Sequence, residues 1–128
     1  MIDHIGIDVS DFEASKRFYT AALQGIGYTK LQEFPASVTG TTDVAGFGED
    51  NKPDFWISGG GPTRPKMHVA FRVSSRALVD AFHQSALAAG ATDNGAPGLR
   101  PHYHPNYYGA FVLDPDGHNI EAVCHEPV

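Results

Sequence analysis

Apolar and polar residues alternate in two stretches of the chain, residues 1–9 and 67–73, and both stretches predict β-strands. Each is followed by residues that favour the start of a helix, Ser10-Asp11 and Ser74-Ser75. Apolar residues then recur at helical spacing until glycines near positions 25–27 and 90. Both halves of the chain therefore predict a strand followed by a helix.

Three shorter strands follow each predicted helix. In the first half they cover residues 28–34, 42–47 and 54–58, and in the second half 91–96, 108–113 and 119–124. Each half is therefore a βαβββ module. The breaker-rich segment 59–65 joins module one (about 1–60) to module two (about 66–125). A module of about 60 residues is only marginally stable alone, so we expect both to pack into one α+β domain over residues 1–128.

An internal repeat supports this division. When the sequence is shifted by 64 positions, His4 aligns with His68, Phe18 with Phe82 and Phe47 with Phe111. The predicted elements align in the same frame. This agreement predicts two modules related by a pseudo-twofold axis.

Composition narrows the possible partners and the compartment. Nine Lys and Arg against fifteen Asp and Glu give a net charge of −6, which argues against nucleic acid as a partner. No apolar stretch approaches the roughly 18 residues of a membrane span. The chain opens without the pattern of a secretion signal and has a single cysteine, Cys124, so we expect a cytoplasmic protein without a membrane association.

Candidate chemistry lies on one face of the first strand of each module. Because side chains alternate along a strand, His4 and Asp8 share one face, and His68 and Arg72 share the matching face of the second module. The opposite, apolar faces should lie under the helices. The pseudo-twofold axis would then bring His4 close to His68. Asp8 and Arg72 would either form an ion pair across the seam between the modules or both reach water at the open end of the cup.

The last predicted strand carries Glu121 on a face otherwise shared by Asn119 and Val123. A buried carboxylate is costly unless it is paired, and a metal ion held also by two imidazoles would remove that cost. His4, His68 and Glu121 would leave coordination positions open for water or substrate. The alternatives are two hydrogen-bonded structural histidines and a solvated glutamate.

Several motifs resemble the vicinal oxygen chelate superfamily, which includes glyoxalases, bleomycin-resistance proteins, fosfomycin-resistance proteins and extradiol dioxygenases. The matching motifs are His4-Ile5-Gly6-Ile7, Met67-His68-Val69-Ala70-Phe71 and Phe111-Val112-Leu113-Asp114-Pro115-Asp116-Gly117-His118-Asn119-Ile120-Glu121. The resemblance implies paired βαβββ modules that form a cup-shaped mixed sheet. It also implies a divalent metal ion (Fe, Mn, Ni, Zn or Co) held by His4, His68 and Glu121.

One position departs from the glyoxalase pattern. Glyoxalases of this superfamily usually supply a fourth ligand from the last strand of the first module. The repeat places Ile57 there, and a slip of one residue places Trp56 there. Neither side chain binds metal, and Asp54 comes too early, which disfavours glyoxalase I chemistry.

The segment of residues 100–108 is rich in His and Tyr and should cover the mouth of the cup. Such side chains supply acid/base groups and hydrogen-bond donors, and an arginine binds carboxylate or phosphate. The catalytic candidates are His104, Tyr108 and His102. The substrate-binding candidates are Arg100, Tyr103, Trp56 and Phe47. The alternative for this segment is packing against a neighbouring subunit or the module beneath it.

The pattern and the resemblance together favour a metal-dependent enzyme whose metal binds two adjacent oxygens of a small substrate. The reaction would be of the lyase, isomerase or dioxygenase type. The alternative is a metal-free protein that sequesters a small molecule, as bleomycin-resistance proteins do. We expect a homodimer, in which the modules pair either within one chain or across two chains.

Overall fold

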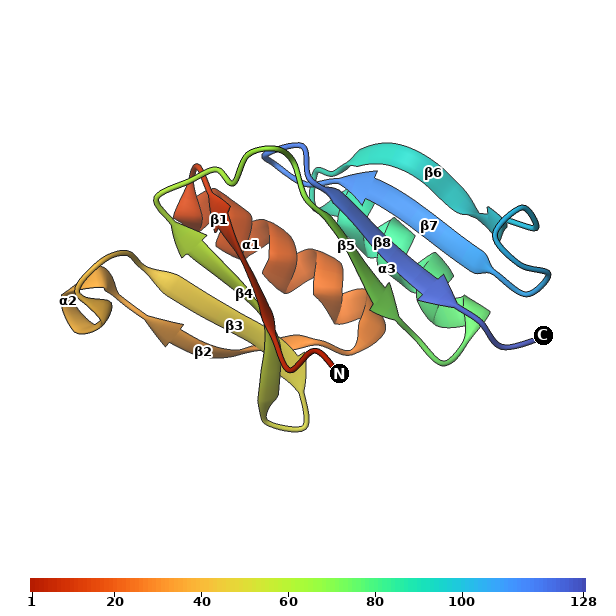
Figure 1. Ribbon diagram of the computed structural model, residues 1–128, viewed down its shortest axis with the longest axis horizontal. Helices are drawn as coiled ribbons and strands as arrows, with labels where there is room; N and C mark the ends of the chain where they lie inside the picture. Colours follow the sequence, from red (N-terminus) through yellow and green to blue (C-terminus); the bar gives the residue numbers. More distant parts are fainter.

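The computed structural model describes residues 1–128 and contains two four-stranded sheets, one in each half of the chain (Figure 1). Module one contains β1 (Ile5–Val9), α1 (Phe12–Ala22), the 3-10 helix η1 (Leu23–Ile26), β2 (Thr29–Phe34), α2 (Ala36–Thr39), β3 (Val44–Glu49) and β4 (Lys52–Gly59). Module two contains β5 (His68–Arg72), α3 (Arg76–Ala88), β6 (Thr92–Leu99), β7 (Tyr108–Leu113) and β8 (Asn119–Cys124). The predicted α+β fold with two βαβββ modules is confirmed, and only the short helix α2 was not predicted. No helix is long and apolar enough to cross a membrane.

The two sheets share one topology. Their strand orders are β1-β4-β3-β2 and β5-β8-β7-β6, and in each sheet the first and last strands of the module are parallel neighbours. The strands β1 and β5 form the inner edges of the two sheets, which lie side by side (Figure 1). This topology places residues of β5 directly beside residues of β8.

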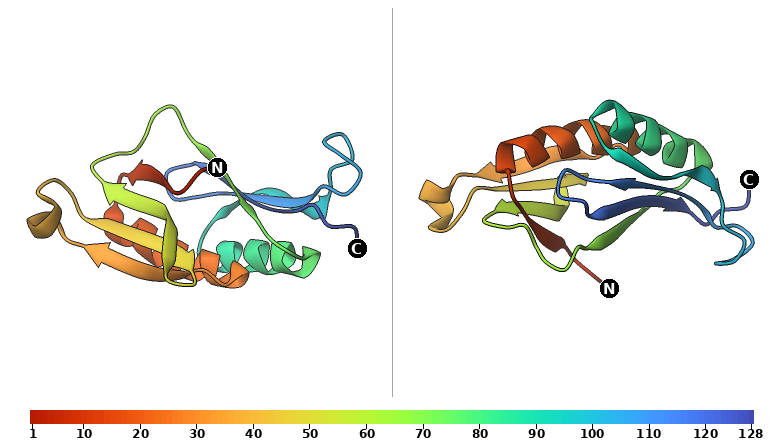
Figure 2. Two further views of the ribbon diagram at one scale, coloured as in Figure 1. Left: turned by 60° about the horizontal axis from the view of Figure 1, so that its bottom comes forward. Right: turned by 90° about the horizontal axis from the view of Figure 1, so that it is seen from above.

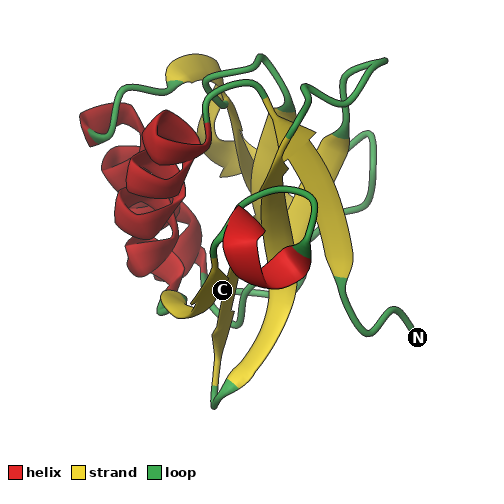
Figure 3. Cartoon of the chain, turned by 90° about the vertical axis from the view of Figure 1, so that its left-hand side faces the viewer, coloured by secondary structure: helices red, strands yellow, loops and turns green.

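Both long helices cover the same side of the molecule. Figures 2 and 3 show α1 and α3 as one layer and the strands as another. The strand residues that face the helices are apolar and buried, for example Ile7 and Val9 in β1 and Val69 and Phe71 in β5. This is the burial pattern expected from the period of two. The opposite face of each sheet carries no helix and is the open face of that module.

The core contains a cluster of aromatic side chains under α1. Tyr19, Phe47 and Phe55 are fully buried, and the ring centre of Phe47 lies 6.2 Å from Tyr19 and 6.4 Å from Phe55. Phe47 therefore packs in the core beneath α1, away from the open face, and cannot line a substrate pocket. That expectation was wrong because Phe47 falls on the helix-facing side of β3.

The turn at residues 114–117 of module two is bonded to module one. The buried hydroxyl of Tyr19 donates to the Asp114 carboxylate, and the Ser10 backbone N–H donates to Asp116 at 3.1 Å. Of the two residues expected at the start of the helix, Ser10 and Asp11, Asp11 is the cap of α1 and accepts from the Ala14 backbone N–H at 3.1 Å. These bonds fix the edge-to-edge placement of the modules within the chain.

The repeat changes its offset between the first and last strands of the modules. Gly6 pairs with Trp56 and Ala70 pairs with Glu121. Gly6 and Ala70 are 64 positions apart, whereas Trp56 and Glu121 are 65 apart. The structural counterpart of Glu121 is therefore Trp56, the slip of one residue, and Ile57 is buried on the helix side. By the same register the counterpart of Phe111 is Gly46, so the sequence match of Phe111 with Phe47 does not hold in space.

Of the two alternatives for Asp8 and Arg72, the ion pair is not formed in this chain. Both residues are exposed. The linker covers the unpaired edge of β1 at this point, since the backbone N–H of Thr63 donates to the Asp8 carbonyl at 3.1 Å and the Asp8 N–H donates to the Thr63 hydroxyl at 2.8 Å. The linker therefore lies along the edge of β1 at Asp8.

Candidate active site

A pocket of about 390 Å³ opens on module two, on the face of the sheet away from α3. Its lining is aromatic apart from one carboxylate and consists of His68, Tyr103, His104, Tyr107, Phe111 and Glu121. Strands β5, β7 and β8 supply its base, and the loop of residues 100–107 supplies its wall. Of the three predicted metal ligands, His4, His68 and Glu121, only His68 and Glu121 line this pocket.

Glu121 is the buried acidic group at the base of this pocket, with 1% of its surface exposed. The register of β8 places it between Ala70 of β5 and Phe111 of β7, so its side chain projects from the open face. His68 Nε2 lies 2.8 Å from Glu121 Oε1, and the Tyr107 hydroxyl donates to Oε2. His68 is the only basic side chain within ion-pairing distance of this carboxylate.

Tyr107 is a protonated donor at neutral pH. Its partial burial and its hydrogen bond to the Glu121 carboxylate both raise the pKa of the phenol. A phenolate beside a buried carboxylate would place two negative charges together, so the proton stays on the tyrosine oxygen. The site therefore holds one proton at a defined atom beside Glu121.

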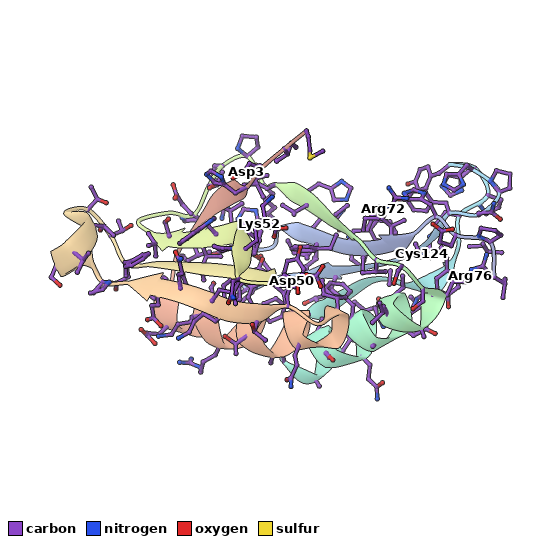
Figure 4. The ribbon with its side chains drawn as sticks, turned by 90° about the horizontal axis from the view of Figure 1, so that it is seen from below. Asp3, Asp50, Lys52, Arg72, Arg76 and Cys124 are labelled. Carbon is purple, nitrogen blue, oxygen red and sulfur yellow. The ribbon has the colours of Figure 1, made fainter.

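His4 lies outside this pocket. It borders a separate hollow of about 490 Å³ on the open face of module one, together with Trp56. Its side chain is 60% exposed, and its Nδ1 lies 2.8 Å from the Asp3 carboxylate. Asp3 also pairs with Lys52 at 3.7 Å, and Figure 4 shows these two side chains together on module one. Within one chain, no group of three His, Cys, Asp or Glu side chains is placed to hold a metal ion.

Trp56 stands in module one where Glu121 stands in module two. Its indole lies against Gly46: a Cβ atom at that position would be only 2.9 Å from three atoms of the six-membered ring, so the contact requires glycine there. The open face of module one therefore offers an apolar plate beside His4 instead of a carboxylate. Asp54 is half-buried and accepts a hydrogen bond from the Tyr28 hydroxyl at 2.8 Å.

The loop of residues 100–107 forms the rim of the Glu121 pocket. The Arg100 guanidinium lies 5.5 Å from the centre of the Phe111 ring and donates to the Ala96 carbonyl at 2.7 Å. Tyr103 is largely exposed at the mouth, and its ring lies 4.2 Å from the ring of His102. The segment thus covers the pocket of module two, as expected from the sequence.

Tyr108 does not belong to the site. Its hydroxyl donates to Asp80 of α3 at 2.7 Å, and the Arg76 guanidinium lies 5.1 Å from its ring. Tyr108 therefore faces the helix layer, and its neighbour Tyr107 takes the place beside Glu121. Alternation along β7 could have identified this, since positions 107, 109 and 111 share the face of Glu121.

The comparisons with known proteins agree with the fold. The sequence profile of the Glyoxalase/Bleomycin resistance protein/Dioxygenase superfamily matches residues 1–122. The chain therefore belongs to this superfamily. No curated protein sequence matches the chain significantly.

Similar solved structures cover nearly the whole chain. A glyoxalase/bleomycin resistance protein from Albidiferax ferrireducens T118 is 26% identical, with 98% of each chain covered and a TM-score of 0.75. A glyoxylase/bleomycin resistance protein/dioxygenase domain from Frankia sp. EAN1pec is 21% identical, with 98% of each chain covered and a TM-score of 0.74. The E126Q mutant of the fosfomycin resistance protein FosX from Listeria monocytogenes, complexed with Mn(II) and 1S,2S-dihydroxypropylphosphonic acid, is 19% identical. That match covers 98% of this chain and 93% of FosX, with a TM-score of 0.67.

Proposed function

We propose that the chain is a divalent-metal-dependent enzyme that acts on a small oxygenated substrate, in a reaction of the lyase, isomerase or dioxygenase type. The observation that carries this proposal is the burial of the Glu121 carboxylate against His68, with no lysine or arginine to compensate its charge. A carboxylate oxygen and an imidazole nitrogen suit Fe, Mn, Ni, Zn or Co. FosX, which shares the fold, is described with Mn(II) bound, which supports the choice of a divalent ion.

The third ligand in this proposal is His4 of a second copy of the chain. His4 is exposed beside an open hollow, and the faces that carry His4 and Glu121 have no helix over them. In a twofold dimer, the open face of module one in one copy meets the open face of module two in the other. Two equivalent sites then form, each with His68 and Glu121 from one chain and His4 from its partner.

When bound, the metal would supply Lewis acidity toward two adjacent oxygens of the substrate. The chain's own residues do the rest. Tyr107 holds a proton at its oxygen beside Glu121 and is the candidate acid/base group. The ring of His104 lines the same pocket, but both of its nitrogens are hydrogen-bonded, to His125 and to the Asn106 N–H, so His104 would not exchange protons with a substrate. Arg100 and Tyr103, at the rim, would orient a polar substrate, and Trp56 of the partner would contribute an apolar wall. His102 is exposed outside the pocket and would act only on a substrate that extends past the rim.

A metal-free binding protein is the second candidate. It is favoured by the hydrogen bonding of Glu121, since both carboxylate oxygens already have a donor, from His68 and from Tyr107. In that case the aromatic pocket would take a small molecule directly. For either function, a reducing cytoplasm is the compartment we propose, consistent with the single free cysteine, Cys124.

Metal content separates the two candidates. Purified protein is loaded in turn with Fe(II), Mn(II), Ni(II), Zn(II) and Co(II), and the bound metal and the melting temperature are measured. An enzyme of the proposed kind binds about one ion per chain, and the melting temperature rises with the preferred ion because only the folded state binds it. His68→Ala should remove both effects, whereas His83→Ala, on α3 and bonded to Asp93 of β6, should keep them. Equal and weak binding by all three proteins would refute the metal site.

A further inference from the structure

Two histidines join the loop of residues 100–107 to the segment that follows β8. His104 lies in the loop, and His125 comes four positions after Glu121. His104 Nε2 and His125 Nδ1 are 2.5 Å apart, and the two rings are stacked at 26° with their centres 4.8 Å apart. His125 was not a candidate from sequence because it stands near the end of the chain.

The hydrogen bonds around these rings define which nitrogens carry the protons. The Asn106 backbone N–H donates to His104 Nδ1 at 3.1 Å, so this nitrogen is an acceptor. A neutral imidazole carries one proton, so the proton of His104 is on Nε2 and is donated to His125 Nδ1. His125 in turn carries its proton on Nε2. The contact is therefore a directed hydrogen bond from His104 to His125.

Both rings pack against Tyr107. The ring centre of Tyr107 lies 5.4 Å from His104 and 5.3 Å from His125, at interplanar angles of 72° and 85°. The backbone N–H of Tyr107 donates to the His104 carbonyl at 3.1 Å, and the Tyr107 carbonyl accepts from the Arg100 N–H at 2.7 Å. The phenol is thus enclosed by edge-to-face contacts, with its hydroxyl directed at Glu121.

We propose that His125 is a positioning residue. Its Nδ1 accepts a hydrogen bond from His104 Nε2 and so fastens the loop of residues 100–107 over the pocket. The fastened loop in turn holds the Tyr107 hydroxyl at Glu121. The fastening itself follows from the contacts of these four residues alone. Its consequence for catalysis rests on the proposed function of the Glu121 pocket.

Two substitutions of His125 separate the hydrogen bond from the bulk of the ring. In His125→Asn the side-chain oxygen can replace Nδ1 as an acceptor, whereas His125→Leu keeps volume without an acceptor. Amide hydrogen exchange is measured by NMR on the full chain without added metal. Because a neutral hydrogen bond contributes about 0.5–1.5 kcal/mol, we expect the amides of Arg100 and Tyr107 to exchange about two- to tenfold faster in His125→Leu. His125→Asn should exchange like the wild type.

His102→Leu, in the same loop but outside the pair, is the matched control and should leave both amides unchanged. The amide of Val112, in the core of module two, shows whether a variant has lost global stability. Exchange at the same rate in wild type and His125→Leu would overturn the proposal, and so would faster exchange in Asn and Leu variants alike. NMR spectra of ¹⁵N-histidine-labelled protein test which ring nitrogens carry the protons. A proton on Nδ1 of His104 would also overturn the proposal. Since no metal is present, these results do not depend on whether the Glu121 pocket binds one.

Discussion

The open faces of the two modules differ most at one matched pair of positions, Glu121 in module two and Trp56 in module one. The strands around them pair in the same register, with Ala70 beside Glu121 and Gly6 beside Trp56. In module two the carboxylate accepts hydrogen bonds from His68 and Tyr107. In module one the indole lies over a glycine. A single strand position thus decides whether a face presents a carboxylate or an apolar plate.

The neighbouring strand explains how each face tolerates its residue. Gly46 has no side chain and leaves room for the indole of Trp56, whereas its counterpart Phe111 stands beside Glu121 and limits access of water to the carboxylate. The two modules therefore contribute unequally to the proposed metal site. Module two supplies two ligands and module one supplies only His4.

The largest expected effect comes from Glu121→Gln, which keeps the size of the side chain and removes its charge. Mutation of a residue that only hydrogen-bonds to a metal ligand typically lowers metal affinity by about 10–100-fold. For Glu121, as a direct ligand, we therefore expect a loss of at least about 100-fold. Isothermal titration calorimetry with the preferred metal ion measures the affinity. Asp54→Asn, a half-buried acid of module one bonded to Tyr28, is the control and should bind as the wild type does. Unchanged affinity in Glu121→Gln would rule out this residue as a ligand.

Trp56→Glu removes the difference between the modules at this position. The new carboxylate would stand at the position of module one that matches Glu121, beside His4. Because affinity rises with the number of charged ligands, we expect metal binding tighter by about tenfold. Glutamine has nearly the same shape as glutamate but no charge, so Trp56→Gln should show no gain in metal affinity. Weaker binding in the Glu variant than in the Gln variant would contradict the matched placement.

Gly46→Ala tests the contact between the indole and the glycine. The added Cβ would lie 2.9 Å from the ring, and we expect the forced shift to cost about 1–3 kcal/mol of unfolding free energy. Urea unfolding gives the stability. The emission of Trp56, the only tryptophan of the chain, reports its environment and should shift to longer wavelength. In Gly6→Ala the new Cβ meets the Trp56 side chain at an ordinary 3.9 Å, so that variant should show neither change.

The smallest effect is expected for Tyr108→Phe. This change removes one hydrogen bond to Asp80 on the exposed side of α3, and surface changes of this kind stay within about 0.5 kcal/mol. Metal affinity should not change, because Tyr108 faces away from Glu121. A clear loss of metal binding in Tyr108→Phe, with none in Tyr107→Phe, would reverse the assignment of these two tyrosines.

Local patterns in the sequence were sufficient for the elements and for half of the site. Alternation identified the strands, and it placed His68 and Glu121 on one face of neighbouring strands, where the structure joins them at 2.8 Å. Capping residues and glycines located the helices. The change of repeat offset from 64 to 65 was not visible, because it depends on how β4 and β8 align with their neighbours.

Long-range placement accounts for the remaining differences. The repeat could not show that His4 lies apart from His68 within one chain, since the bonds from Asp114 and Asp116 to module one fix how the modules sit. Phe47 and Tyr108 were assigned by residue type, and strand parity places both on the helix-facing side of their sheets. His125 acquires its role only through the fold of the loop that contains His104.

Complementation between two variants, each without one proposed ligand, tests most directly the claim that each metal site combines two chains. His4→Ala and His68→Ala are co-expressed with different tags, and the mixed dimer is purified. If His4 and His68 of one site come from different chains, the mixed dimer holds one intact site, and we predict about one bound metal ion per dimer where each parent variant binds none. A mixed dimer that binds no metal, beside a wild-type protein that binds two ions per dimer, would contradict this account.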